Sequence, residues 1–211
     1  DVIVTTATGA DAAARATTTI PIVVGPTSEE MLTRLAGNLA RPIGNVTGVT
    51  LASNEQNLKC LQLVKEKAPA TSQVALLLNP DNPNFRDYPG NLMPAANQLG
   101  LTLIRIDARS VAALPQAFAA IAASGANAIL LVDDPALAGT REARKQVIEQ
   151  GLSRRLPVAS SNSSVASEGG LVSLGTDRLA LVRRAAVYVD KILKGAKPVD
   201  LPVERPSTFK L

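Results

Sequence analysis

Polar side chains that could hold a small charged molecule follow several strand-like segments of this 211-residue sequence. The adjacent pair Asp133 and Asp134 could bind a ligand ammonium group through charge-assisted hydrogen bonds. Elsewhere, backbone N–H groups and hydroxyls could bind a carboxylate, and the candidate hydroxyls are Thr6, Thr8, Ser160 or Ser161. The full set of candidate ligand-binding residues is Thr6, Thr8, Gly25, Pro26, Thr27, Asn79, Phe85, Tyr88, Asp133, Asp134, Ser160 and Ser161.

Each of these loops also has a purely structural interpretation. The Asp pair could cap the helix that follows it, since Asp favours that position. Residues 79–83, Asn-Pro-Asp-Asn-Pro, form a natural turn whatever their function, and residues 160–164 could be a flexible polar connection. If the ligand-binding interpretation is right, Asp134→Asn and Ser160→Ala should weaken binding while lowering the unliganded stability by no more than about 1 kcal/mol.

The aromatic residues favour an amino acid or a similar zwitterion over a sugar. Only five occur, with no tryptophan, so the stacking surface usual for sugar recognition is scarce. Phe85 and Tyr88 follow a strand and could cover an apolar or aromatic ligand side chain.

Covalent chemistry finds little support among the residue types. The absence of histidine excludes Ser-His-Asp and Cys-His arrangements and every histidine metal site, although Lys- or Asp-based chemistry stays possible. No Gly-x-Gly-x-x-Gly or phosphate-loop motif follows a strand, and residues 166–170 are too generic for a nucleophile site. A single cysteine, Cys60, allows no intrachain disulfide. We therefore expect a protein that is not an enzyme, with no cofactor and no metal.

The charge pattern does not predict a nucleic-acid partner. The formal net charge is +4, from 22 basic and 18 acidic residues. The densest basic stretch, residues 141–155, contains Glu142 and Glu149 and is typical of a solvated helix face. No run of eighteen apolar residues occurs, so no transmembrane helix is predicted.

Continuous apolar runs predict strands buried on both faces, as in a parallel sheet. The runs occupy residues 2–5, 20–24, 74–78, 101–106, 128–132, 157–159 and 171–174. Their spacing fits βα units with right-handed crossovers. The sequence thus predicts an α/β protein with parallel sheets flanked by helices.

Helices are predicted between these strands. Residues 53–56, Ser-Asn-Glu-Gln, resemble a capping box ahead of a helix that Pro69 stops. Glycines predict the ends of four further helices, near residues 100, 125, 151 and 195, and the last of these helices carries an apolar stripe over residues 181–193. Two glycine-bearing segments, residues 41–48 and 169–170, read as hinges where the chain crosses between two lobes, or else as ordinary loops of a single domain.

Three segments together resemble one protein family. They are Gly-Asn-Val-Thr-Gly at 44–48, Gly-Gly-Leu-Val-Ser-Leu-Gly at 169–175, and Ile-Leu-Lys-Gly-Ala-Lys-Pro-Val-Asp-Leu-Pro-Val at 192–203. The resemblance is to the substrate-binding proteins of bacterial ABC transporters, of the tryptophan/tyrosine type, and it covers essentially the whole chain. It implies a two-lobed fold of the type I periplasmic-binding-protein kind.

The resemblance also implies an incomplete first lobe. Lobe one would comprise residues 1–48 plus 176–200 and lack N-terminal βα units, and lobe two would comprise residues 49–175 plus 201–211. Asp1 enters a strand with no preceding cap, which leads us to expect a piece of a longer protein. Since the exposed apolar faces of such a lobe need cover, we expect a partner chain, self-association, a lost N-terminal segment or a proteolytic product.

The implied function is that of the solute-binding component of an ABC importer, which captures a small polar ligand between two lobes. The expected partners are the ligand and the ABC permease and ATPase complex, with no nucleic acid. Contact with the membrane would be made only through the permease or a lost lipid anchor. The expected location is periplasmic or extracytoplasmic, lipid-anchored in a Gram-positive organism. The alternative is a ligand-sensing domain of a transcription regulator or membrane receptor.

Overall fold

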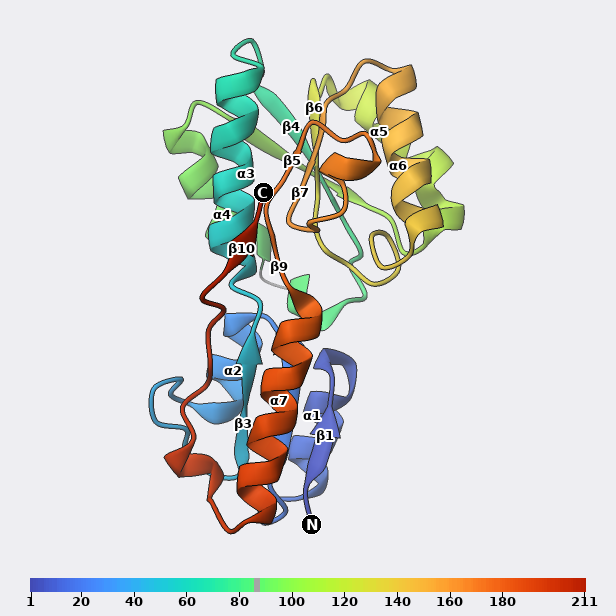
Figure 1. The fold of residues 1–211 in the computed structure, drawn as a ribbon. Helices are drawn as coiled ribbons and strands as arrows, with labels where there is room; N and C mark the ends of the chain where they lie inside the picture. Colours follow the sequence, from blue (N-terminus) through green and yellow to red (C-terminus); the bar gives the residue numbers. More distant parts are fainter. Residues whose placement is uncertain (86–87) are drawn as a thin grey trace. The chain divides into compact units, whose positions relative to one another are not determined.

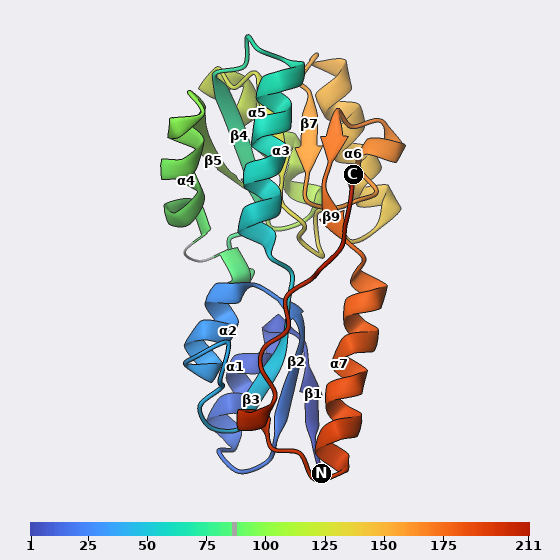
Figure 2. The same cartoon turned by 60° about the vertical axis from the view of Figure 1, so that its left-hand side comes forward.

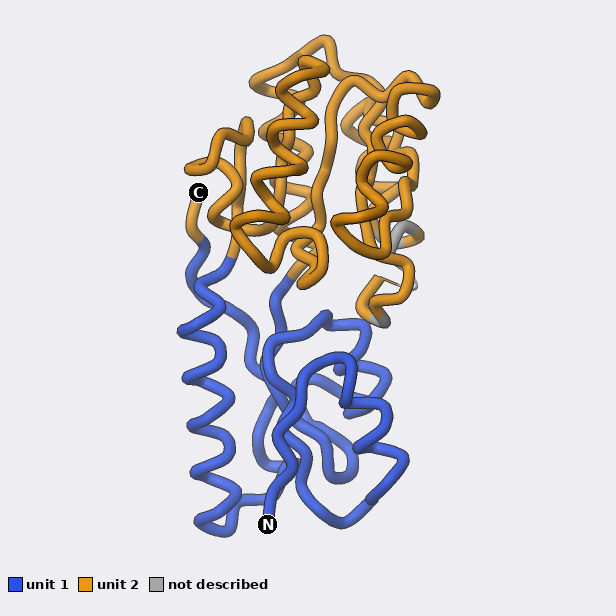
Figure 3. Tube along the Cα trace, turned by 90° about the vertical axis from the view of Figure 1, so that its right-hand side faces the viewer, with its two compact units in different colours: residues 1–52, 176–209 blue, residues 53–175, 210–211 orange. Residues whose placement is uncertain are grey.

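The chain folds into two compact α/β units in the computed structural model, which describes residues 1–85 and 88–211. Unit 1 comprises Asp1–Ala52 and Thr176–Phe209, and unit 2 comprises Ser53–Gly175 and Lys210–Leu211 (Figure 3). Each of the two segments predicted to be a hinge lies within one unit: residues 41–48 lie in unit 1 and residues 169–170 lie in unit 2. The predicted positions of the hinges were wrong, because glycine also occurs where two segments pack closely and not only where the chain crosses between units.

Unit 1 is a three-stranded parallel sheet with helices on both faces (Figure 2). The strand order is β1-β2-β3, and buried apolar side chains fill the space between sheet and helices on each side. One face packs against α1 and α2, and the other packs against α7. The bounds are β1 Ile3–Thr5, α1 Ala7–Ala16, β2 Ile22–Thr27, α2 Glu29–Ala36, β3 Val46–Thr50, α7 Arg178–Leu193 and the short 3-10 helix η4 Pro198–Asp200.

Strand β3 corrects the interpretation of residues 41–48 as a hinge. All five residues of β3 are buried, and Val46 pairs with Ile22 of the central strand. A Cβ on Gly48 would lie 2.3 Å from the carbonyl oxygen of Val24. Glycine at this position therefore allows two backbones to approach closely, and it does not absorb a change of direction.

Residues 201–209 of the C-terminal tail also belong to unit 1, although residues 201–211 were predicted from the sequence to lie in lobe two; only Lys210–Leu211 fall in unit 2. Leu201 and Val203 are buried in the two apolar layers of unit 1. The tail then runs beside β3, because Thr50 donates its backbone N–H to the Glu204 carbonyl at 2.8 Å and Glu204 donates to Gly48 at 3.0 Å. These contacts hold residues 201–209 in unit 1, and the short strand β10 (Phe209–Lys210) pairs with β9 (Gly175–Thr176).

Unit 2 is a five-stranded parallel sheet of order β5-β4-β6-β7-β8 (Figure 1). Helices α3 and α4 pack on one face, and α5 and α6 pack on the other. The bounds are α3 Ser53–Lys67, β4 Gln73–Leu78, η1 Pro83–Phe85, α4 Tyr88–Gln98, β5 Thr102–Asp107, η2 Val111–Ala113, α5 Leu114–Ser124, β6 Ala128–Leu131, α6 Arg141–Ser153, β7 Val158–Ser160, η3 Ala166–Glu168 and β8 Val172–Ser173.

Helix α6 continues past Gly151, where the sequence analysis ended it. A Cβ on Gly151 would meet Val158 Cγ2 at 2.6 Å, so this glycine lets α6 lie close to β7. By contrast, Gly125 has the left-handed φ of 74° expected of a residue that terminates a helix, here α5. Along the described ranges 1–85 and 88–211, no helix combines the length and apolar character that crossing a bilayer requires.

Candidate functional site

The edge of unit 2 where its strands end brings together most of the polar residues that the sequence analysis selected there. Strands β4, β6 and β7 are adjacent and parallel, so the segments after Leu78, Leu131 and Ser160 meet at one edge. We call residues 79–85, 132–138 and 160–164 the unit 2 edge; the first two ranges follow β4 and β6, and the third begins at the last residue of β7.

Asp134 is fully buried at this edge and acts as a structural acceptor. Its Oδ2 accepts a hydrogen bond from the side-chain amide of Asn82 at 2.6 Å. Its Oδ1 accepts from the backbone N–H of Ala136 at 2.8 Å and of Leu137 at 3.2 Å. Both carboxylate oxygens therefore have protein partners, and the carboxylate caps the turn 134–138, while Thr140 caps α6 itself.

Asp133 is only half-buried and lies beside Asn162 of the next loop. The Asn162 side-chain amide donates to Asp133 Oδ1 at 2.9 Å and to the carbonyl oxygen of Ala138 at 3.2 Å. This one amide thus joins the loop after β6 to the loop after β7. Of the two neighbouring carboxylates, Asp133 is the one that keeps access to solvent.

The two serines at the end of β7, Ser160 and Ser161, differ in their hydrogen bonding. Ser160 is fully buried, donates its hydroxyl to the Leu131 carbonyl at 2.7 Å and accepts from the Asn162 backbone N–H at 3.0 Å. The Ser161 hydroxyl is also buried, but it has no hydrogen-bond partner among residues 1–85 and 88–211. The Ser160 hydroxyl therefore joins the end of β7 to the end of β6, whereas the donor and the acceptor of the Ser161 hydroxyl are both unused among the described residues.

The remaining candidates of unit 2 are Asn79, Phe85 and Tyr88. Asn79 is partly buried, and its Oδ1 accepts from the Asp81 backbone N–H at 3.0 Å, which closes the expected turn. The Phe85 ring is 5% exposed and packs in the apolar core with β4 and α4, so burial in the core contradicts its expected role as a cover for the ligand. The side chain of Tyr88 lies outside the described part of the chain.

Arg144 and Glu168 form an ion pair that the sequence analysis missed. Arg144 donates from Nε and Nη2 to the two Glu168 oxygens at 2.7 and 2.6 Å, with side chains 11% and 16% exposed. The paired hydrogen bonds lower the pKa of the Glu168 carboxyl and raise that of the Arg144 guanidinium. Arg144 was read as part of a solvated face, but it lies three and four residues before the buried Val147 and Ile148, and this spacing identifies the inner face of α6.

In unit 1, the corresponding edge presents Thr6 and Thr8 at the N-terminus of α1. The Thr6 hydroxyl lies 3.2 Å from the Thr8 hydroxyl and makes no capping bond to the helix backbone, and both residues are exposed. The first turn, Ala7-Thr8-Gly9-Ala10, carries no acidic residue. Because the first N–H groups of a helix lack intrahelical partners, this terminus suits an anion.

Gly25, Pro26 and Thr27 belong to strand β2, whereas the sequence analysis placed them in a loop. Thr27 is buried, with its hydroxyl 3.4 Å from the sulfur of Met31. Ser28 caps the following helix α2, whose first turn contains Glu29 and Glu30. The N-terminus of α2 is thus already capped by Ser28 and neutralised by acidic side chains, unlike that of α1.

An apolar groove of about 580 Å³ lies beside these residues in unit 1. Helix α7 covers β2 and β3, which leaves the exposed Val4 of β1 next to Val182 of α7. The groove is lined by Val4, Thr5, Thr6, Gly25, Pro26, Val182, Ala185, Ala186 and Val189. Three of the candidate ligand-binding residues, Thr6, Gly25 and Pro26, therefore line the same groove. Within the described ranges, no group of three or more Cys, Asp or Glu side chains is placed to hold a metal ion.

The sequence model of a family described as ABC transporter substrate binding protein matches residues 1–211. The chain belongs to this family of ABC transporter substrate-binding proteins. It is 22% identical to the tyrosine-binding protein of Clostridioides difficile (strain R20291) over 194 residues, which cover 92% of this chain and 54% of that protein. The chain thus spans about half the length of this curated relative.

Two solved structures are similar to this substrate-binding protein over almost its whole length. A conserved domain protein from Vibrio cholerae O1 biovar El Tor strain N16961 has a TM-score of 0.87 and 28% identity, covering 99% of this chain and 69% of that one. The ABC domain from Streptococcus pneumonia in complex with L-Trp has a TM-score of 0.84 and 25% identity, covering 100% and 71%. The fold is of the periplasmic-binding-protein type, with parallel sheets flanked by helices.

Proposed function

We propose that this chain is the solute-binding component of an ABC importer and that it binds an amino acid or a related zwitterion. Support comes from the family match over residues 1–211 and from two relatives whose names specify tyrosine and L-Trp as ligands. The same match favours transport over the alternative role in a transcription regulator or membrane receptor. We propose an extracytoplasmic location, with delivery of the ligand to a permease and ATPase.

The N-terminus of α1 carries this proposal for the ligand carboxylate. Thr6 and Thr8 offer two exposed hydroxyls there, and the terminus has neither a side-chain cap nor an acidic first turn. Charge-assisted hydrogen bonds contribute about 1.5–3 kcal/mol each, so a few of them, after ordering costs, are consistent with roughly micromolar affinity. Capture followed by release requires affinity of this order.

For the ligand ammonium group we propose Asp133 and not Asp134. Asp133 is half-buried and accessible, whereas both oxygens of the buried Asp134 accept protein hydrogen bonds. Ser161, with its unused hydroxyl, is the second candidate at the unit 2 edge. These polar groups bind and orient a ligand, and the proposal assigns no covalent step to any of them.

Isothermal titration of the chain with the twenty amino acids tests the proposal, with L-tyrosine and L-tryptophan as the first probes. Tyramine, which lacks the carboxylate, and 3-(4-hydroxyphenyl)propanoate, which lacks the ammonium group, serve as matched probes. We expect the zwitterion to bind at least tenfold more tightly than either analogue. Equal affinity for all three, or binding of sugars alone, contradicts the proposal.

Variants then assign the two charged groups of the ligand. The double variant Thr6→Val and Thr8→Val should lose the preference for tyrosine over tyramine, and Asp133→Asn should lose the preference over the propanoate. The control is Thr33→Val, an exposed position in the middle of α2, where no change is expected.

Self-association through the exposed apolar side chains of unit 1 stays a prediction. Val4 and Val182 are two of these side chains, and sedimentation velocity measures self-association directly.

A further inference from the structure

The ion pair between Arg144 and Glu168 connects the two loops that carry Asp133 and Ser161. Besides its two bonds to Glu168, Arg144 donates from Nη1 to the carbonyl oxygen of Ala138 at 2.9 Å. Ala138 is the last residue of the turn 134–138, and its backbone N–H donates to the carbonyl oxygen of Asp134 at 2.7 Å. One guanidinium therefore uses three N–H donors to hold the loop after β6 and the short helix after β7.

Glu168 is in turn fixed to the loop after β7. Its backbone N–H donates to the carbonyl oxygens of Ser164 and Val165 at 3.1 and 3.2 Å, and these residues belong to the loop that follows Ser161. The Asn162 amide shares the Ala138 carbonyl with Arg144 and also bonds to Asp133. A continuous chain of hydrogen bonds thus runs from Glu168 through Arg144 and Ala138 to Asn162 and Asp133.

We infer that Arg144 and Glu168 are positioning residues that hold the unit 2 edge in its ligand-binding shape. Neither side chain supplies a group to the ligand in this proposal, which rests on the proposed function. Arginine suits the role because its planar guanidinium reaches two carboxylate oxygens and a carbonyl at once, which the single ammonium of lysine does not. Arg144→Lys keeps the positive charge but loses the planar guanidinium, and it should therefore fail to hold the unit 2 edge in its ligand-binding shape.

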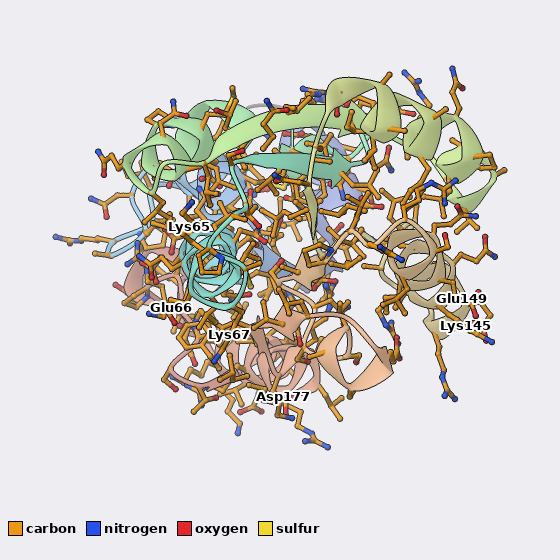
Figure 4. All side chains as sticks on the ribbon, turned by 90° about the horizontal axis from the view of Figure 1, so that it is seen from above. Lys65, Glu66, Lys67, Lys145, Glu149 and Asp177 are labelled. Atoms are coloured by element: carbon orange, nitrogen blue, oxygen red, sulfur yellow. The ribbon has the colours of Figure 1, made fainter. Side chains whose placement is uncertain are left out.

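The test compares wild type, Arg144→Lys and Glu168→Gln with a control on the same helix. The control is Lys145→Ala, which removes an exposed ion pair to Glu149, 3.6 Å away on the outer side of α6 (Figure 4). Titrations with L-tyrosine and L-tryptophan are made well below the melting temperature of every variant. We expect Arg144→Lys to weaken binding at least tenfold, Glu168→Gln to weaken it severalfold, and Lys145→Ala to leave it unchanged.

Hydrogen–deuterium exchange of the unliganded proteins separates positioning from general destabilisation. Faster exchange confined to residues 133–138 and 160–168 supports the inference, whereas faster exchange throughout the sheet of unit 2 contradicts it. Wild-type affinity in Arg144→Lys overturns the inference and leaves the proposed function intact. If neither amino acid, nor any other in the panel, binds the wild type, the proposed function is wrong and this inference falls with it.

Discussion

Replacement of Asp134 by alanine tests the structural role assigned to this carboxylate. Three donors bind it in the folded state, from Asn82, Ala136 and Leu137. Leu137 retains a second acceptor, the Asp134 carbonyl at 3.2 Å, so alanine leaves two donors without a partner. A buried donor left unsatisfied costs about 1–3 kcal/mol, and we therefore expect the free energy of unfolding to fall by about 3 kcal/mol.

Asparagine at the same position should cost less, for a geometric reason. Its Oδ1 can still accept from Ala136 and Leu137, but its amide group then faces the Asn82 amide. Rotation of the Asn82 amide would restore that contact and lose the bond from the Asn84 backbone N–H to Asn82 Oδ1, now 3.0 Å. One hydrogen bond is lost in either arrangement, so the free energy of unfolding should fall by about 1–2 kcal/mol. This value replaces the limit of about 1 kcal/mol expected from the sequence.

The assay is urea unfolding of the unliganded chain, followed by circular dichroism, in a double-mutant cycle with Asn82→Ala. Because Asn82 and Asp134 bond directly, we expect a coupling energy of at least about 1 kcal/mol. Asp107→Asn in β5, whose side chain is 45% exposed beside Arg105, is the control and should change stability by less than about 0.5 kcal/mol. An Asp134→Ala variant as stable as this control would refute the structural role.

Three further predictions concern packing, pH and thiol reactivity. Gly48→Ala should lower the unfolding free energy by about 3 kcal/mol in urea titrations, since its Cβ would lie 2.3 Å from the Val24 carbonyl oxygen, whereas Gly90→Ala meets nothing within 4 Å and should not destabilise. The pKa of Glu168 is lowered by Arg144, so its contribution to stability is complete above the ordinary value of 4.5 and is lost as pH falls below it; the difference between wild type and Glu168→Gln should shrink in urea titrations from pH 6 to 3. Burial raises the pKa of the Cys60 thiol to about 11, so a thiol reagent at pH 8 should react with Cys60 only after urea unfolds unit 2, and rapid reaction of the native chain would contradict this packing.

The sheet of unit 2 could be predicted because its strands are apolar on both faces. Residues 74–78 and 128–131 are all buried, and a continuous apolar run has no stable place at a surface. Helices α1 and α2 received no bounds from the sequence, because their short segments lack a clear stop signal and their stability comes from packing against the sheet of unit 1.

Glycine accounts for most of the remaining errors in the fold. Gly48 and Gly151 look in the sequence like residues that turn or end an element, yet both allow backbone or side chains to approach within 3 Å of where a Cβ would lie. The local sequence does not distinguish such a glycine from one that ends a helix, as Gly125 does, because the difference lies in the strand or helix that packs beside it. A glycine by itself therefore does not identify a hinge or the end of a helix.

The polar residues of the site show a further limit, because their availability depends on partners distant in the chain. Asp133 and Asp134 are equivalent in sequence terms, but Asp134 is satisfied by an asparagine 52 residues away, and Ser160 by a carbonyl 29 residues away. A buried acceptor whose bonds are complete can bind a ligand only by breaking them, at a cost similar to the gain. Better candidates than Asp134 and Ser160 are consequently the exposed Thr6 and Thr8, the half-buried Asp133, and Ser161, whose hydroxyl has no partner in the described part of the chain.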